Sequence, residues 1–261
     1  MSETVLYTLA ESVATITLNR PHVMNALDDA MIVRLRAVCE QARDDAAVRA
    51  VVLRGEGPAF LAGGDVALFH ANLERLPQMV ERLAGELHHA IMALRGAKKP
   101  VIASVHGAVA GAGVSLLAAA DVAIAARGTK FTLAYSKIGT SPDGGSTYFL
   151  PRLVGMRKAL ELLMLSETFD ANTAQSIGLV NWVVNDADLA AQTAGIARRL
   201  ASGPTNAYGE TKLLVNESFG RALSAQLEAE VRAFMRCART RDLAEGVTAF
   251  VEKRKPDFEG R

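Results

Sequence analysis

The sequence predicts an α/β fold, in which a mainly parallel sheet is followed by a long helical region. In the first half, β-rich segments alternate with amphipathic helical segments, an order typical of parallel strands joined by right-handed crossovers. From Gly155 onward the pattern is almost wholly helical. The chain has 261 residues and half are hydrophobic, which is enough for one large core.

The first half divides into elements at its turn residues. Two β-rich runs, 4–9 and 13–19, are separated by a short Ala-Glu-Ser turn and predict a hairpin. An apolar strand at 48–53 and a buried strand at 101–105 both end in glycine-rich residues. The further elements predicted here are helices at 28–46, 76–94 and 112–119 and a strand at 121–127.

The second half is predicted to be helical, with one apolar interruption at 179–184. A helical region of about a hundred residues is longer than the helices needed to cover one sheet, so part of it should form a separate layer. Such layers often carry subunit contacts, and we therefore divide the chain into 1–200 and 201–261. The predicted helices are 155–165, 171–177, 187–201, 204–216, 221–238 and 242–253.

Composition argues against several classes of protein. With 29 basic and 28 acidic residues, the net charge of +1 does not favour nucleic acid or a membrane surface as partner. Cys39 and Cys237 are too far apart to suggest a disulfide framework or a metal site. The apolar run 108–120 is too short to span a bilayer, and residues 1–12 lack a signal-peptide pattern. We therefore expect a cytoplasmic protein.

Two glycine-rich turns follow two of the predicted strands, as "AFLAGGDV" and "VHGAVAGAG". Ligands of α/β proteins gather at the carboxyl ends of strands, and glycine lets backbone N–H groups face outward. The second turn also opens a helix, where the N–H groups of Ala112 and Gly113 have no helical acceptor. This chemistry is that of an oxyanion hole, which holds a developing negative oxygen.

Other glycine-rich sites fit less well. The run from Gly111 to Leu116 lacks the third glycine of a dinucleotide fingerprint, and the Gly-Lys-Ser/Thr of a phosphate-binding loop is absent. A nucleophile elbow fails because Leu117 stands where its second glycine belongs. Ser115 is therefore interpreted as a small helix residue that faces the site or the core.

One carboxylate, Asp143, stands in the segment "LAYSKIGTSPDGGSTYFLPR", residues 133–152. Pro-Asp-Gly-Gly is ordinary turn chemistry, since proline sets φ, aspartate bonds its own backbone and glycine accepts positive φ. The residues alone leave two interpretations open: an ordinary turn, or a loop that presents one acid to a substrate.

The motifs together resemble the enoyl-CoA hydratase/isomerase (crotonase) superfamily. They are "ITLNRPHVMNALDDAM", "AFLAGGDV", "KKPVIASVHGAVAGAGVSLLAAADVAIAA", "GLV" and "EGVTAFVEKRKPDF", and they cover essentially the whole chain in order. The resemblance implies a ClpP-like spiral of ββα units with a C-terminal trimerisation region, assembled as a homotrimer or a dimer of trimers. It implies an acyl-CoA thioester as substrate, and no metal or redox cofactor. The acyl-CoA site would lie in 1–200, with 201–261 supplying oligomer contacts and a lid over CoA.

The resemblance also implies roles for particular residues. The backbone N–H groups of Gly64 and Ala112 would form the oxyanion hole, and both roles are independent of the side chain. Phe250 and Lys253 match positions that reach CoA bound to a neighbouring subunit. The remaining substrate or CoA contacts would be Met24, Asn25 and Ala26 near the adenine, Ala62, Asp65, Val66 and Ala67 near the thioester arm, and Ser115 and Tyr135.

The acids distinguish the reactions of the superfamily. The two glutamates with which the hydratase branch activates water are replaced by Ser115 and Tyr135, neither of which is a base near neutral pH. Asp143 matches the single acid/base of the isomerase branch, closest to the ring-epoxide isomerase of phenylacetate degradation and the Δ3,Δ2-enoyl-CoA isomerases. It would take a proton from C2 and return it at C4.

Three alternatives remain beside an isomerase. The first is an enoyl-CoA hydratase. The second is a 4-chlorobenzoyl-CoA-type dehalogenase, for which His88 would be the auxiliary histidine, although Tyr135 stands in place of the expected tryptophan. The third is a non-catalytic member recruited to bind RNA, which the near-zero net charge and the retained Asp143 both disfavour.

Overall fold

Six strands form the larger sheet in the computed structural model, which describes residues 3–261. β1 and β2 pair as an antiparallel hairpin, as predicted, and every other neighbouring pair in this sheet is parallel. In spatial order the strands are β1 (Val5–Ala10), β2 (Val13–Leu18), β3 (Ala50–Gly55), β5 (Val101–Val105), β7 (Val122–Ala126) and β10 (Trp182–Val184).

A second, smaller sheet was not predicted. Three of its strands each follow a strand of the larger sheet directly, so that one strand enters each sheet before a helix begins. This repeat is the ββα unit that the resemblance implied. The strands escaped prediction because two or three residues are too short to show an alternating pattern. They are β4 (Ala59–Leu61), β6 (Ala108–Ala110), β8 (Lys130–Thr132) and β9 (Phe169–Asp170).

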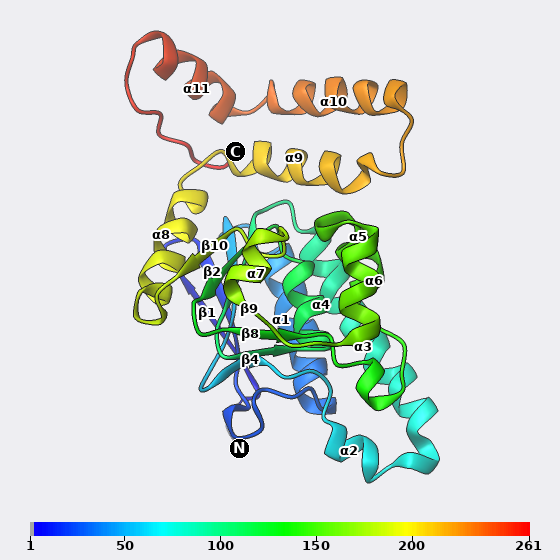
Figure 1. Cartoon of the computed structure of the whole chain (residues 1–261). Helices are drawn as coiled ribbons and strands as arrows, with labels where there is room; N and C mark the ends of the chain where they lie inside the picture. The colour runs from blue at the N-terminus through cyan, green and yellow to red at the C-terminus, as the bar shows by residue number, and fades with distance from the viewer. Residues whose placement is uncertain (1–2) are drawn as a thin grey trace.

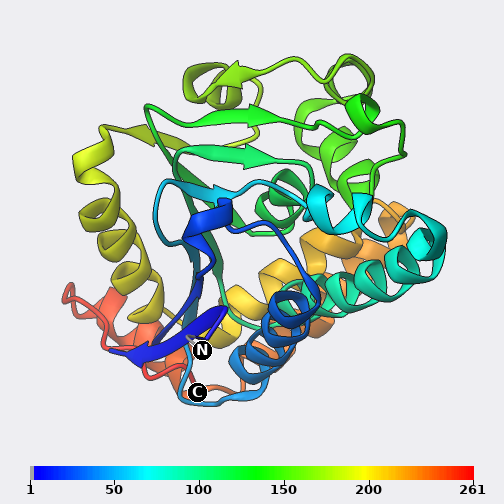
Figure 2. The same ribbon diagram turned by 90° about the horizontal axis from the view of Figure 1, so that it is seen from below.

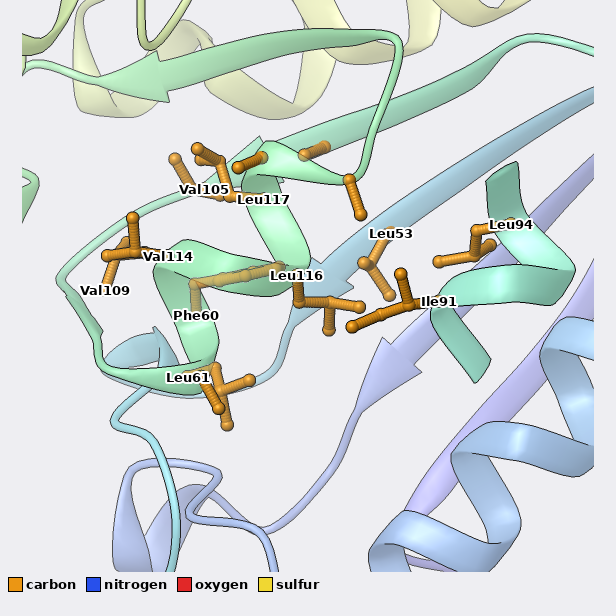
Figure 3. Close-up of a cluster of buried hydrophobic side chains, with 14 of the residues drawn as sticks. Leu53, Phe60, Leu61, Ile91, Leu94, Val105, Val109, Val114, Leu116 and Leu117 are labelled. Carbon is orange, nitrogen blue, oxygen red and sulfur yellow. The ribbon is translucent and has the colours of Figure 1, made fainter. Parts of the chain in front are cut away.

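The main core lies between the sheets and two long helices, α1 (Asp29–Asp44) and α3 (Leu76–Gly96), which pack on each other. Asp28 caps α1 by accepting a hydrogen bond from the N–H of Met31 at 2.9 Å. Figure 3 shows side chains from β3, β4, α3 and α4 (Ala112–Ala118) pointing toward one another. Each such buried aliphatic side chain stabilises the fold by about 1.5–3 kcal/mol.

The other face of the larger sheet is covered by α8 (Leu189–Ala201), so helices lie on both faces (Figure 2). Short helices connect and cover the remaining parts. These are η1 (Pro21–Val23), α2 (Val66–His70), η2 (Leu73–Arg75), η3 (Ser136–Ile138), α5 (Ser146–Val154), α6 (Met156–Leu165), α7 (Ala171–Ser176) and η4 (Asp186–Asp188).

The last three helices form a separate layer at the top of Figure 1: α9 (Thr205–Ser218), α10 (Leu223–Cys237) and α11 (Arg241–Val251). Lys212 attaches α9 to the core, because its Nζ lies 2.8 Å from Asp121 and donates to the carbonyl of Leu94 at 2.7 Å. Burial lowers the pKa of Lys212, while Asp121 opposes that shift. The division of the chain near residue 200 into two functional parts stays a prediction.

Most predicted elements lie within a few residues of their observed bounds, and the main difference is α5. Between the predicted strand at 121–127 and residue 155 no helix was predicted, whereas α5 begins at Ser146, directly after the Asp143 turn. Pro151 lies inside α5 and obscures its helical pattern. No helix in residues 3–261 is long and apolar enough to cross a membrane.

Candidate active site

A cavity of about 230 Å³ opens where the two glycine-rich turns meet α3 and the loop before α5. Its wall is mainly apolar, and it includes Gly64, Ala112, Tyr135 and Asp143. A larger hollow of about 580 Å³ lies between the larger sheet and α8, but none of the predicted site residues lines it. The smaller cavity is therefore the candidate active site.

The N–H of Gly64 is directed by the pairing of its neighbours. Gly64 forms an isolated parallel bridge with Leu27, in which Leu27 N–H donates to the Gly63 carbonyl at 2.8 Å and Asp65 N–H donates to the Leu27 carbonyl at 3.0 Å. These bonds occupy the groups on one side of the turn, so the Gly64 N–H faces the other way. Within residues 3–261 it has no hydrogen-bond acceptor.

Ala112 supplies the second N–H of the cavity wall. It is the first residue of α4, where a helix leaves its N–H groups without an acceptor, and none is found for Ala112 in the described chain. The start of α4 also approaches β4 closely. A Cβ at Gly113 would lie 2.3 Å from the Leu61 carbonyl oxygen, so only glycine allows this approach.

The carboxylate of Asp65 has a structural role. It accepts a hydrogen bond from the N–H of Leu68 at 3.1 Å, which caps α2, and it lies 3.4 Å from Arg20. Asp65 is absent from the cavity wall, as is the exposed Ala67, whereas Ala62 and Val66 line it. The predicted contact of this stretch with the thioester arm of CoA stays a prediction.

Asp143 lies in the predicted turn and faces the cavity. The Tyr135 hydroxyl donates a hydrogen bond of 2.8 Å to its Oδ1. Ser115 Oγ lies 3.0 Å from the Tyr135 hydroxyl and 3.1 Å from the main-chain oxygen of Asp143. The two residues that replace the hydratase glutamates therefore contact each other and the one acid.

Tyr135 is buried, and its pKa is raised first by burial and second by the neighbouring Asp143 carboxylate. The phenol therefore stays protonated near neutral pH and remains a hydrogen-bond donor. Ser115 is fully buried and does not line the cavity, so its predicted substrate contact is replaced by contacts with the site residues.

Other predicted residues lie away from this cavity. His88 is exposed, because it is one residue beyond the buried Leu87 and a helix turns about 100° per residue. His88 is also not among the described residues that line the cavity, and its auxiliary role stays a prediction. Phe250, 86% exposed, and the exposed Lys253 lie at the end of α11, and their role toward a neighbouring subunit stays a prediction.

The predicted adenine-binding stretch has one exposed and two buried residues. Met24 is 49% exposed, whereas Ala26 is buried and Asn25 is fully buried. The amide of Asn25 donates to the main-chain oxygens of Ala59 at 2.7 Å and Glu56 at 2.9 Å. The side chain of Asn25 therefore holds this loop against β4, and the predicted contact of this stretch with CoA stays a prediction.

The chain also matches known proteins in sequence and in structure. Residues 8–261 fit the sequence model of the family described as enoyl-CoA hydratase/isomerase. The chain belongs to this family. It is 41% identical over 261 residues to a Rhodobacter capsulatus protein named "Probable enoyl-CoA hydratase", covering 99% of this chain and 98% of the relative.

The chain is also similar to an isomerase in sequence and to a hydratase in structure. A 1,2-epoxyphenylacetyl-CoA isomerase from Escherichia coli is 38% identical, with all of both chains covered. The crystal structure of an enoyl-CoA hydratase from Polaromonas superposes with a TM-score of 0.93 at 35% identity, covering 98% of this chain and 99% of that one. The fold is therefore the crotonase fold, as the sequence predicted.

Sequence reasoning missed part of this family site. Phe69 and Val80 line the cavity, and α3 extends the wall to Leu83, Ala84 and Leu87, none of which was predicted to contact substrate. Helical periodicity alone cannot distinguish a residue that faces a cavity from one that faces the core. Ser146, whose hydroxyl donates to the Asp143 carbonyl at 2.8 Å, gave no recognisable signal because α5 itself was not predicted.

Proposed function

We propose that this enoyl-CoA hydratase/isomerase family member is an acyl-CoA isomerase that moves a proton with Asp143. One observation carries the proposal. Among the described residues that line the cavity, Asp143 is the only carboxylate, and it shares the wall with the unpaired N–H groups of Gly64 and Ala112. One acid and two backbone donors are sufficient for an enolate mechanism.

The reaction needs no atoms beyond the substrate and the protein. The N–H groups of Gly64 and Ala112 would donate to the thioester oxygen of a 3-enoyl-CoA. Asp143 would take a proton from C2, and the electron pair of the broken C–H bond would delocalise into a dienolate. Return of the proton to C4 then moves the double bond to C2–C3. Each oxyanion donor lowers the barrier by about 3 kcal/mol.

Hydration is the second candidate function, and the name of the Rhodobacter capsulatus relative favours it. It would require a group that holds and activates water opposite the acid. The hydroxyls of Ser115 and Tyr135, at the glutamate positions, are already hydrogen-bonded. Dehalogenation is less favoured, because the exposed His88 is not in the cavity wall.

The cavity wall also indicates what kind of acyl group the substrate carries. Its residues from α3 are apolar, and the cavity volume suits a compact apolar or aromatic acyl group. The Escherichia coli relative is named for an aromatic substrate, 1,2-epoxyphenylacetyl-CoA. A panel of linear and aromatic acyl-CoA thioesters would identify the preferred group.

The test incubates the protein with a 3-enoyl-CoA and follows the conjugated 2-enoyl thioester, with crotonyl-CoA hydration measured in parallel. We expect isomerisation, and we expect Asp143→Asn to lower kcat by about three orders of magnitude or more, because the proton acceptor is lost. CoA binding should change little. Asp44→Asn, an exposed substitution at the end of α1, is the matched control. Fast hydration without isomerisation would reject the proposal.

A further inference from the structure

The contacts of Asp143 differ between its two carboxylate oxygens. Oδ1 accepts the 2.8 Å hydrogen bond from Tyr135, whereas Oδ2 has no partner among the described residues. We propose that Tyr135 is a positioning residue that fixes Asp143 by Oδ1 and leaves Oδ2 to carry the substrate proton, and that Ser115 acts through Tyr135. The inference rests on the proposed function for the identity of the proton.

The hydroxyl groups around Asp143 are linked by hydrogen bonds. The main-chain oxygen of Asp143 accepts from Ser146 Oγ at 2.8 Å, from Ser146 N–H at 3.1 Å and from Ser115 Oγ at 3.1 Å. The Ser115 hydroxyl also lies 3.0 Å from the Tyr135 oxygen, so its one proton is shared between the Asp143 main-chain oxygen and Tyr135. Tyr135 in turn directs its single proton to Asp143, so hydrogen bonds connect Ser115 to the Asp143 carboxylate through Tyr135.

Packing holds this chain of hydroxyls in place. Ser115 is fully buried and Tyr135 is 8% exposed, so neither side chain is free to turn toward water. Gly144, with φ of 56°, brings the loop against α4. A Cβ there would lie 2.8 Å from the Cβ of Ser115. The contact between Ser115 and the Asp143 loop thus depends on a glycine in the turn.

The arrangement has a consequence during proton transfer. When Oδ2 takes the proton from C2, Oδ1 becomes the carbonyl oxygen of a carboxylic acid and still accepts from Tyr135. The carboxyl group therefore keeps its orientation until the proton leaves for C4. No covalent bond of Tyr135 or Ser115 is broken, so both act on the reaction only through Asp143.

The hydrogen bond between Tyr135 and Asp143 has no competitor in the cavity wall. Asp143 and Tyr135 are the two ionisable side chains that line the cavity in the described chain, so no other charge there competes with this hydrogen bond. Removing the phenol oxygen should therefore leave the Asp143 carboxylate free to rotate.

The test is Tyr135→Phe, which removes one oxygen and keeps the ring. We expect kcat to fall about 10- to 100-fold, as for a lost hydrogen bond to a charged group. KM should change much less than kcat, because the lost hydroxyl is bonded to Asp143 and the variant keeps the ring. Tyr148→Phe, at an exposed tyrosine of α5, is the control and should change neither quantity.

Ser115→Ala separates positioning from a general structural effect. It should lower kcat by a smaller factor than Tyr135→Phe does, again with little change in KM. The double variant with Tyr135→Phe should equal Tyr135→Phe alone, because Ser115 acts through the phenol. Additive effects of the two substitutions would overturn this part of the inference.

A readout that is independent of turnover completes the test. In protein labelled with carbon-13 aspartate, the Asp143 carboxyl resonance is assigned by its loss in Asp143→Asn, and its chemical shift is compared in wild type and Tyr135→Phe. An unchanged chemical shift in Tyr135→Phe would overturn the inference. A wild-type enzyme that does not isomerise 3-enoyl-CoA, combined with the expected change in chemical shift, would reject the proposed function and still support the contact between Tyr135 and Asp143.

Discussion

Single residues of this site act through their backbone as often as through their side chains. Ala112 carries a side chain, yet the group that matters is its N–H, which every residue except proline carries. The neighbouring Gly113 has no such freedom, because β4 lies against its Cα. Position 112 therefore tolerates a methyl group, while position 113 does not.

Gly113→Ala tests this at the residue scale. Its Cβ would lie 2.3 Å from the Leu61 oxygen, so α4 must shift and the N–H of Ala112 must move with it. We expect the free energy of unfolding to fall by about 1–3 kcal/mol. The fractional loss of kcat should be larger than the fractional loss of folded protein.

Chemical denaturation and steady-state kinetics on the same samples measure both effects. Gly85→Ala is the control, since a Cβ at Gly85 in α3 meets no atom within 4 Å. That change should stabilise the protein by about 0.5–1 kcal/mol. Full activity in Gly113→Ala would show that the turn tolerates a shift of the donor.

Among the elements, α3 determines the shape of the acyl cavity. Val80, Leu83, Ala84 and Leu87 recur at intervals of three and four residues and line the cavity as one helical face. The same rotation carries His88 to the exposed face, which removes the histidine that a dehalogenase would need. Ala84 is the smallest residue of this face, so the cavity is wider there than it would be beside a larger side chain.

Ala84→Leu should therefore narrow the acyl cavity without affecting the chemistry. We expect kcat/KM for a bulky aromatic acyl-CoA to fall about tenfold or more, because a pocket that loses room for a methylene group discriminates by about that factor. The change for a short linear thioester should be smaller. Ala191→Leu, an exposed position on α8, is the control and should alter neither substrate. An equal loss for both substrates would place Ala84 outside the acyl wall.

Considered as a whole, the molecule has a layer of helices whose apolar side chains are not covered by the chain itself. On α10, Leu223, Leu227, Val231 and Phe234 recur at intervals of four, four and three residues and are more than half exposed. Exposed apolar surfaces of this kind mark contacts with other proteins. A second copy of the chain is the partner that the predicted homotrimer requires, and Phe250 would then lie near a neighbour's CoA.

Phe234→Asp tests the assembly. Light scattering should give a trimer or hexamer for the wild type and a smaller species for the variant, because a carboxylate in an apolar contact is left without a partner. Gln192→Asp, which adds the same charge at an exposed position of α8, should leave the mass unchanged. A monomeric wild type would contradict the predicted assembly.

Local patterns were enough to predict much of the fold. Helical and strand periodicity located α1, α3 and the strands of the larger sheet, since each presents one buried face to the core. The short strands β4, β6 and β8 carried too few residues for such a pattern. In α5, Pro151 concealed a helix whose first residue, Ser146, supports the Asp143 turn.

The sequence by itself determined the order of the elements, the two glycine-rich turns, the single acid at Asp143 and the family to which they belong. These are local features, because each depends on the residue types within a few positions of one another. Only the tertiary structure decided that Ser115 and Tyr135 hydrogen-bond to each other and to Asp143, and that His88 lies outside the cavity. Such contacts depend on how helices rotate and pack across the fold, and residue spacing along the chain does not encode that rotation.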